Sequence, residues 1–254
     1  MATFIERLDA ACASNQSLAC VGLDPDPQLM PVKDVFAFNK AIVDATYDLV
    51  CAYKPNLGFY EALGLPGLQA LDQTIRYIRD VAPGAIVLGD AKRGDVGNTA
   101  TAYARALFER WGFDAVTVNP YLGGDSVQPF TKYKDRGVFV LCKTSNLGAG
   151  DLQDALVTSG DNSRPLYQMV ASLAKKWNGH GNVGLVVGAT YPQELKAARE
   201  ICPDMPILIP GIGSQSGDLE QAVRYGTDSN GRRALVNSSR GIIYASSGSG
   251  FAQA

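Results

Sequence analysis

Residues 90–95 read Asp-Ala-Lys-Arg-Gly-Asp, which places one lysine between two carboxylates. Flanking carboxylates hold a lysine in its charged form, ready to donate a proton. Asp90 and Lys92 are two residues apart, so on an extended chain both side chains point to one side and Ala91 points away. Asp95 lies further on, where we expect the chain to have turned. The spacing predicts an acid–base site; the alternative interpretation is a solvated charged loop with an incidental ion pair.

The apolar run 85–89 that precedes this pattern is typical of a buried parallel strand. The carboxyl ends of such strands face the active site in parallel α/β folds. Comparable apolar runs alternate with segments of helical periodicity along the whole chain. The expected strands are 18–23, 51–56, 85–89, 115–118, 138–142, 183–187, 207–209 and 234–237. The expected helices are 3–13, 35–49, 65–81, 99–111, 125–133, 165–177, 191–201 and 219–225, with a short closing helix from about Ile242.

These alternations in a chain of 254 residues match a (β/α)₈ barrel, an α/β fold, and a doubly wound open sheet is the second choice. No linker or change of composition divides the chain, so we expect residues 1–254 to form a single catalytic domain. The polar stretch Leu147–Arg164 interrupts the alternation, and we expect it to be a loop insertion.

The composition argues against several classes of protein. A net charge of −2 gives no reason to expect a nucleic-acid polymer or a membrane surface as partner. The five cysteines are scattered, which favours buried reduced thiols in a cytoplasmic protein over a disulfide framework or metal cluster. His180 is the only histidine, so a histidine-based metal site or a serine–histidine triad is not expected.

Further polar residues follow the other expected strands. They are Asp24, Lys54, Asn56, Thr144, Ser145, Gln215 and Arg240. Because the carboxyl ends of barrel strands converge on one face, we expect these side chains to meet Asp90 and Lys92 there. Lys54 could be a lysine that extends to the surface, or a second cation beside Asp90. In the second case Lys54, Asp90, Lys92 and Asp95 would form a row in which each charge has opposite neighbours.

Two loops suggest a phosphate site. Residues 211–217 read Gly-Ile-Gly-Ser-Gln-Ser-Gly, and the glycines allow backbone N–H groups to approach an anion. Arg240 follows the last strand and could bind phosphate through two hydrogen bonds. The loops after the seventh and eighth strands form the usual phosphate site of such barrels.

Together these residues resemble the orotidine 5′-monophosphate decarboxylase family, over nearly the whole chain. The Asp-x-Lys-x-x-Asp signature stands at Asp90, Lys92 and Asp95. The other matching segments are 23–24, 54–56, 144–145, 210–215 and 239–241, and the stretches around Lys54 and Arg240 look like the longer bacterial branch of the family.

The resemblance implies conversion of orotidine 5′-monophosphate (OMP) to UMP and CO₂ in pyrimidine biosynthesis, without cofactor or metal. Lys92 would protonate C6 of the pyrimidine after CO₂ leaves, with Asp90 beside the departing carboxylate and Lys54 between Asp90 and the ribose. In the homodimer that the family implies, Asp95 and Thr99 would belong to the partner subunit's site.

The resemblance also implies a set of substrate contacts. Asp24 would hold the ribose hydroxyls, Ser145 the pyrimidine edge, and Gln215 and Arg240 the 5′-phosphate. Further substrate-binding residues would be Asn56, Pro210, Gly211 and Gly213.

Two competing functions remain open. A Mg²⁺-dependent sugar-phosphate decarboxylase or aldolase of the same superfamily would carry the same signature, but with an acidic residue after the second strand. Lys54 stands there instead, and a lysine cannot ligate Mg²⁺. A non-catalytic phosphate-binding barrel would have to treat the four alternating charges as accidental.

Overall fold

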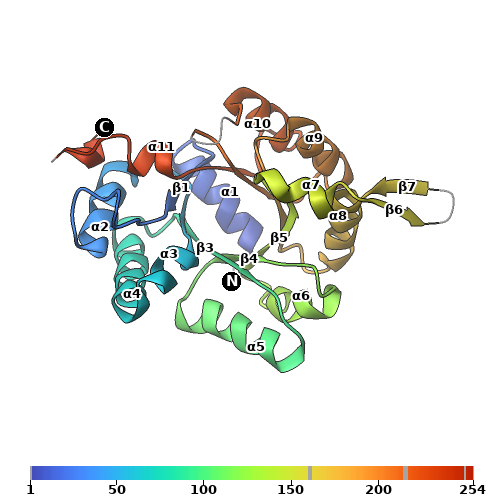
Figure 1. Ribbon diagram of the computed structural model, residues 1–254, viewed down its shortest axis with the longest axis horizontal. Helices are drawn as coiled ribbons and strands as arrows, with labels where there is room; N and C mark the ends of the chain where they lie inside the picture. Colours follow the sequence, from blue (N-terminus) through green and yellow to red (C-terminus); the bar gives the residue numbers. More distant parts are fainter. Residues whose placement is uncertain (1, 160–161, 214–216, 249, 254) are drawn as a thin grey trace.

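The computed structural model describes residues 2–159, 162–213, 217–248 and 250–253. Parallel strands close into a barrel in the order β1-β10-β9-β8-β5-β4-β3-β2, and the helices surround it (Figure 1). The strands are β1 (Ala19–Leu23), β2 (Ala52–Pro55), β3 (Ile86–Arg93), β4 (Ala115–Val118), β5 (Gly137–Lys143), β8 (Val183–Val187), β9 (Ile207–Pro210) and β10 (Ala234–Ser238). The first and last strands pair, with Ala19 opposite Val236. The (β/α)₈ barrel is therefore confirmed, and the doubly wound open sheet is wrong.

The expected helices are present with shifted ends. They are α1 (Phe4–Ser14), α2 (Val35–Thr46), α4 (Gly64–Val81), α5 (Gly97–Arg105), α6 (Gly124–Thr131), α8 (Leu166–Trp177), α9 (Pro192–Ile201), α10 (Leu219–Gly226) and α11 (Arg240–Ile243). A π-helical turn, Ala106–Arg110, continues α5. A short helix α3 (Leu57–Ala62) was not expected; Asn56 caps it, with its Oδ1 accepting from the Gly58 N–H at 3.3 Å.

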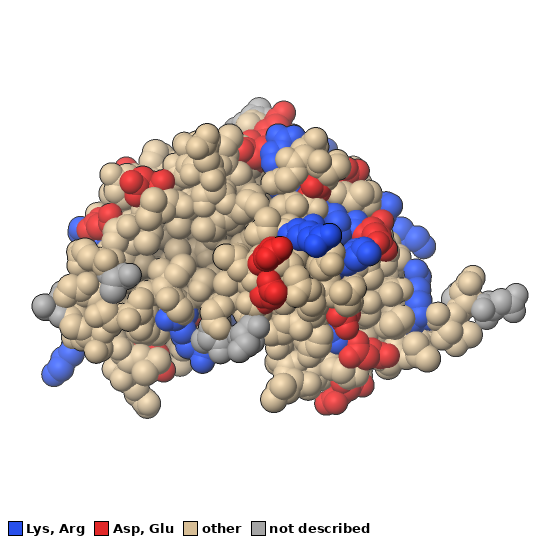
Figure 2. Space-filling model, turned by 90° about the horizontal axis from the view of Figure 1, so that it is seen from above, with Lys and Arg blue, Asp and Glu red and all other residues tan. Residues whose placement is uncertain are grey.

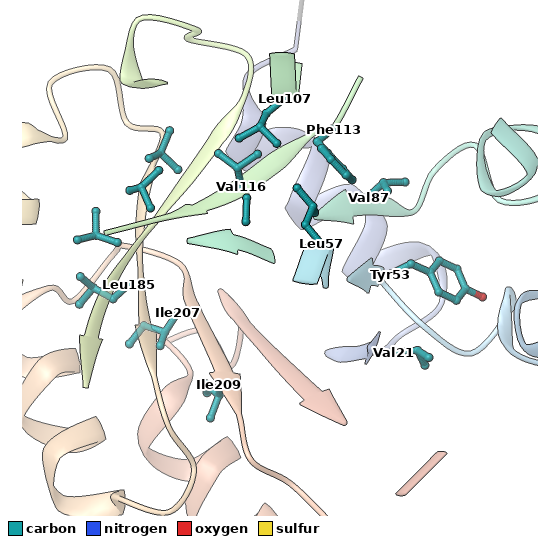
Figure 3. Close-up of a cluster of buried hydrophobic side chains, with 14 of the residues drawn as sticks. Val21, Tyr53, Leu57, Val87, Leu107, Phe113, Val116, Leu185, Ile207 and Ile209 are labelled. Carbon is teal, nitrogen blue, oxygen red and sulfur yellow. The ribbon is translucent and has the colours of Figure 1, made fainter. Parts of the chain in front are cut away.

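Side chains along the barrel strands alternate between two apolar clusters, as the two-residue period of a strand requires. One cluster lies between the strands and the surrounding helices and includes Val21, Tyr53 and Val116 (Figure 3). The other fills the barrel interior and includes Leu88 and Phe139. Buried on both faces, the strands read as nearly continuous apolar runs, and this made them recognisable from the sequence.

Helix α1 fills the amino-terminal end of the barrel. The ring of Phe4 packs edge-on against Phe139, with ring centroids 6.0 Å apart, and lies next to Gly137 at the start of β5. Phe4 and Leu8 are both fully buried, which stabilises the fold by about 1.5–3 kcal/mol per side chain. With this end closed by apolar groups, the polar interior residues lie towards the carboxyl ends of the strands.

The stretch Leu147–Arg164, expected as a loop insertion, lies between β5 and α8 as an insertion but has secondary structure of its own. The segment contains a 3₁₀ turn (Leu147–Ala149), the short helix α7 (Gly150–Gln153) and an antiparallel pair, β6 (Leu156–Ser159) and β7 (Asn162–Pro165). The pair projects from the barrel beside α8 (Figure 1). Its backbone hydrogen bonds hold it together, while residues such as Leu156 stay exposed. The segment therefore lacks the apolar pattern by which a core strand is recognised.

The surface carries charges of both signs. Lys and Arg side chains are interspersed with Asp and Glu on the face shown in Figure 2. Opposite charges thus largely offset one another there, in keeping with the net charge of −2. Across the described ranges, no helix combines the length and the apolar character needed to cross a membrane.

Candidate active site

A cavity of about 500 Å³ opens at the carboxyl end of the barrel. The expected residues that line it are Asp24, Lys54, Asn56, Asp90, Lys92, Thr144, Ser145, Pro210, Gly211 and Arg240. Residues to which the sequence assigned no individual role line it as well, namely Leu141, Asn146, Gln153, Val186, Leu208, Ile212, Asn237 and Ser239. The polar residues gathered from separate strand ends thus share one space, as the barrel topology requires.

The strand period explains why charged groups face into the cavity. Lys54 is two residues beyond Ala52 and Asp90 two beyond Leu88, and both apolar residues belong to the barrel interior. The polar side chains therefore form the next layer above the apolar interior. Asn237, near the end of β10, occupies the equivalent place above its own strand and was not expected in the site, because residues 234–237 were interpreted only as a strand.

Asp90 is the centre of a hydrogen-bonded group of charges. Lys92 Nζ lies 2.7 Å from both carboxylate oxygens of Asp90, and Lys54 Nζ lies 3.3 Å from Oδ2. Thr117 Oγ1 donates to Oδ1 at 2.8 Å. The side chains of Lys54 and Asp90 are 4% and 11% exposed, whereas that of Lys92 is 49% exposed. The alternative of a solvated loop with an incidental ion pair does not fit such burial.

The charges of Asp90 and Lys54 stabilise each other. Burial alone would raise the pKa of Asp90, but the ammonium groups of Lys54 and Lys92 outweigh it and hold that pKa well below its usual range. Burial alone would lower the pKa of Lys54, but Asp90 and Asp24 outweigh it and raise that pKa above its usual range. Both groups therefore remain charged throughout the neutral pH range.

The backbone at Lys92 is not extended, so the geometry expected there is wrong. Lys92 has φ of 47°, a left-handed conformation that side chains rarely adopt. The pairing of β3 with β4 shifts register between Gly89 and Arg93, and the Lys92 N–H donates to Thr117 Oγ1 at 2.9 Å. Ala91 is buried in the cluster between strands and helices, as expected. The irregular pairing turns the chain, and the Lys92 ammonium still reaches Asp90.

The expected phosphate loops meet at the edge of the cavity. Gly211 and Gly213 have φ of 104° and 87°, which only glycine adopts easily, and Gly213 lies close to Gly241 in α11. Arg240 begins α11 and lines the cavity. It has no ion-pair partner in the part of the chain that the structure describes. Gln215 lies outside the described residues.

Two polar atoms of the site are buried and lack a hydrogen-bond partner among the described residues, Asp24 Oδ1 and Asn237 Oδ1. Leaving such an acceptor unpaired costs about 1–3 kcal/mol. Both residues line the cavity, so a ligand hydroxyl or amide in it would offset this cost.

Apolar side chains complete the cavity wall. Leu141, Val186 and Leu208 line it from β5, β8 and β9. An apolar wall excludes water and strengthens the electrostatic interactions of Asp90 and Lys92 with a bound molecule.

Asp95 and Thr99 do not reach the cavity of their own chain. Asp95 Oδ1 accepts a hydrogen bond from the Val96 N–H at 2.7 Å, and Thr99 is exposed on α5. Neither residue is among those that line the cavity. One copy of the chain therefore brings together Lys54, Asp90 and Lys92, but not the second carboxylate of the signature.

The arrangement suits protonation next to a developing negative charge. An exposed ammonium faces the cavity, and a buried carboxylate orients it through both oxygens. Across the described residues, no group of three or more His, Cys, Asp or Glu side chains could hold a metal ion.

Comparison with known proteins gives a consistent result. A family model described as the orotidine 5′-phosphate decarboxylase / HUMPS family matches residues 17–253. A relative from Roseiflexus castenholzii, named orotidine 5′-phosphate decarboxylase, is 52% identical over 258 residues, covering 99% of this chain and 92% of the relative. A relative of that name from Cellvibrio japonicus is 51% identical over 261 residues, covering 99% and 93%. The structure of Leishmania donovani OMP decarboxylase superposes with a TM-score of 0.86 at 41% identity, covering 99% of this chain and 95% of that one.

Proposed function

Since the chain belongs to the orotidine 5′-phosphate decarboxylase family, we propose that the Asp90–Lys92 pair performs the chemistry of that family at the carboxyl end of the barrel. The protein is a carboxy-lyase that converts OMP to UMP and CO₂ in pyrimidine biosynthesis. The observation that carries the assignment of the chemistry is the 2.7 Å contact of Lys92 Nζ with both oxygens of Asp90, inside a cavity large enough for a nucleotide.

In the proposed mechanism the C6–carboxylate bond breaks, CO₂ leaves, and the electron pair stays on C6. The pyrimidine ring offers no electron sink for that charge. The Lys92 ammonium, fixed in advance by Asp90, stabilises it electrostatically and then transfers a proton from Nζ to C6. Asp90 also lies beside the substrate carboxylate, and their repulsion is relieved when CO₂ departs.

The remaining contacts are assigned from their places around the cavity. Lys54 lies between Asp90 and the ribose, with Asp24 and Asn56 on the ribose hydroxyls. Asp24 Oδ1 supports this assignment because it is a buried acceptor that has no partner among the described residues. Ser145, after β5, hydrogen-bonds the pyrimidine edge.

The phosphate is assigned to the loops after β9 and β10. The backbone N–H groups of Gly211 and Gly213, together with Gln215 and Arg240, bind its oxygens. Pro210, which has no N–H to donate, lines the cavity beside them and contributes to the shape of the site. The positive φ angles of the two glycines and the cavity-lining position of Arg240 support the proposal. Binding at this remote group supplies energy that is used at the ring.

We further propose a cytoplasmic homodimer in which Asp95 and Thr99 enter the partner's site. Neither residue lines the cavity of its own chain, and Val96, which follows Asp95, is 57% exposed. The cysteines, buried as free thiols, suit a reducing compartment. Because the family match spans residues 17–253, we propose that the whole chain acts as one catalytic domain.

An absorbance assay tests the proposal against the metal-dependent alternative. With OMP as substrate, we expect activity that survives exhaustive treatment with EDTA, because Lys54 occupies the strand end where a Mg²⁺ ligand would be needed. Loss of activity on chelation, with recovery on adding Mg²⁺, would favour the sugar-phosphate enzymes. A protein that binds UMP but turns over no OMP would instead be a non-catalytic phosphate-binding barrel.

A further inference from the structure

Gln153, the last residue of α7, is hydrogen-bonded to the loop that follows β5. The Thr144 N–H donates to Gln153 Oε1 at 2.8 Å, and Gln153 Nε2 donates to Thr144 Oγ1 at 2.8 Å. The same hydroxyl donates to Asn146 Oδ1 at 2.7 Å. One side-chain amide thus binds both the backbone and the side chain of Thr144, which leaves that residue little freedom to rotate.

The neighbouring residue Asp154 anchors this amide to the barrel. Lys143 Nζ lies 2.6 and 2.7 Å from the two oxygens of Asp154 and 4.3 Å from the centre of the Tyr191 ring. The Lys143 side chain is fully buried, while that of Asp154 is 49% exposed. A buried ammonium needs a partner, so the pair holds the end of α7 against β5.

Ser145, the residue after Thr144, packs against Gly188. Gly188, after β8, lies so close that a Cβ built on it would be 2.8 Å from Ser145 Cβ. Thr144, Ser145, Asn146 and Gln153 all line the active-site cavity. Ser145 therefore packs against Gly188 and directly follows Thr144, which Gln153 fixes in place.

We propose that Gln153 is a positioning residue for recognition of the nucleobase, and that the Lys143–Asp154 pair sets its location. This inference rests on the proposed function, in which Ser145 contacts the pyrimidine. Fixing Thr144 and Ser145 in advance reduces the entropy lost when the base binds. The α7 segment, outside the regular strand–helix alternation, is thereby part of the substrate-binding machinery.

The first experiment compares two ligands that differ only at the base. UMP and ribose 5-phosphate are titrated calorimetrically into the wild-type enzyme and into Gln153→Ala and Gln153→Met, the latter keeping the length of the side chain. Because two hydrogen bonds are lost, we expect UMP to bind about tenfold more weakly to both variants, and ribose 5-phosphate to bind as before. Gln193→Ala, on an exposed position of α9, is the matched control and should leave both affinities unchanged.

Equal weakening of both ligands, or normal UMP binding by Gln153→Met, would overturn the proposal. The first result would indicate general damage to the fold. The second would show that the hydrogen bonds to Thr144 do not matter for the base.

A double-mutant cycle separates this inference from the function on which it rests. If Gln153 acts through Ser145, the double variant Ser145→Ala/Gln153→Ala should bind UMP only slightly more weakly than Ser145→Ala alone. The loss of affinity in the double variant should then be much smaller than the product of the two single losses. In the double variant Gln153→Ala/Arg240→Ala, which combines the base end with the phosphate end, the two losses of UMP affinity should multiply. An unaltered UMP affinity in Ser145→Ala alone contradicts the proposed contact of Ser145 with the pyrimidine. Independent effects of Ser145→Ala and Gln153→Ala contradict the positioning role.

Discussion

The ammonium nitrogen of Lys92 lies 2.7 Å from both carboxylate oxygens of Asp90, although the backbone of Lys92, inside β3, departs from strand geometry with a φ of 47°. The two groups are therefore aligned by an irregular backbone and not by the ordinary pleat of a strand. Thr117 on β4 fixes both, since its hydroxyl donates to Asp90 Oδ1 and accepts from the Lys92 N–H. The ammonium that we propose as the proton donor is thus held in place before any substrate binds.

Replacing Lys92 by alanine tests its assignment as the proton donor. Lys92→Ala should lose kcat/KM for OMP by several orders of magnitude, because the ammonium both stabilises the carbanion and protonates it. UMP binding, measured by calorimetry, should remain, since the ribose and phosphate contacts are intact. Turnover near the wild-type rate in a folded Lys92→Ala protein would show that another group donates the proton.

The left-handed backbone at position 92 predicts a difference in stability between two variants that lack the ammonium. Lys92→Gly and Lys92→Ala both remove the ammonium, but only glycine adopts a positive φ without strain. The free energy of unfolding of Lys92→Gly, from urea denaturation, should exceed that of Lys92→Ala by about 1 kcal/mol. An alanine variant as stable as the glycine variant would mean that the backbone relaxes once the lysine is gone.

The buried Lys54–Asp90 pair predicts how stability depends on pH. Asp90 has a pKa below the unfolded value of 3.8, so its stabilising contribution is present above that pH and is lost as pH falls towards the folded pKa. Lys54 has a pKa above the unfolded value of 10.5, so its contribution is present below that pH and is lost as pH rises through the folded pKa. The pair should therefore contribute a constant stabilisation between about pH 5 and pH 9.

Urea denaturation of the wild type and Asp90→Asn measures this contribution. At neutral pH the variant should be less stable by about 3 kcal/mol, because Lys54 loses its nearest carboxylate. The difference should shrink by about 1 kcal/mol at pH 3, where Asp90 of the unfolded wild type takes up protons. A difference that stays the same from pH 7 to pH 3 would show that the pKa of Asp90 is not lowered by folding.

The barrel and the polar ends of its strands could be predicted because each strand is a short apolar run followed at once by polar residues. Lys54 and Asp90 were found in this way. Thr117 was not, because within an apolar run a threonine reads simply as a strand former. Its contact with Asp90, 27 residues away, depends on which face of β4 lines the barrel.

Gln153 and Asn237 show a second limit. Gln153 reaches the cavity from a segment whose stability comes from backbone pairing and from the Lys143–Asp154 ion pair. Neither interaction leaves a periodic apolar pattern in the sequence. Asn237 lies inside the last strand, where nothing in the sequence alone distinguishes a side chain facing the interior from one facing the helices.

Arg240 is assigned to the phosphate, and a substrate lacking that group tests the assignment. Arg240→Ala should raise KM strongly for OMP and much less for the nucleoside orotidine. Only OMP carries the phosphate, so only OMP loses a charge-assisted hydrogen bond to the guanidinium. Steady-state assays give, for each substrate, the ratio of the KM of the variant to the KM of the wild type. An equal effect on OMP and orotidine would place Arg240 away from the phosphate.

The separation of Asp95 from the cavity of its own chain makes the shared-site dimer testable. Asp95 bonds to the N–H of Val96 and does not line the cavity, whereas Lys92 does. In a two-fold dimer each subunit would lend its Asp95 to the other. Lys92→Ala and Asp95→Asn should each be inactive alone, because every site of either homodimer lacks one group.

Mixing the two inactive proteins should restore activity. Each hybrid dimer has one site that lacks both groups and one site in which both are intact. With random exchange half of the dimers are hybrids, so activity should reach about a quarter of the wild-type level. Native mass spectrometry measures the hybrid fraction. The control is Lys92→Ala alone, taken through the same exchange procedure, which should stay inactive. Hybrids that form without any return of activity would mean that Asp95 acts within its own chain.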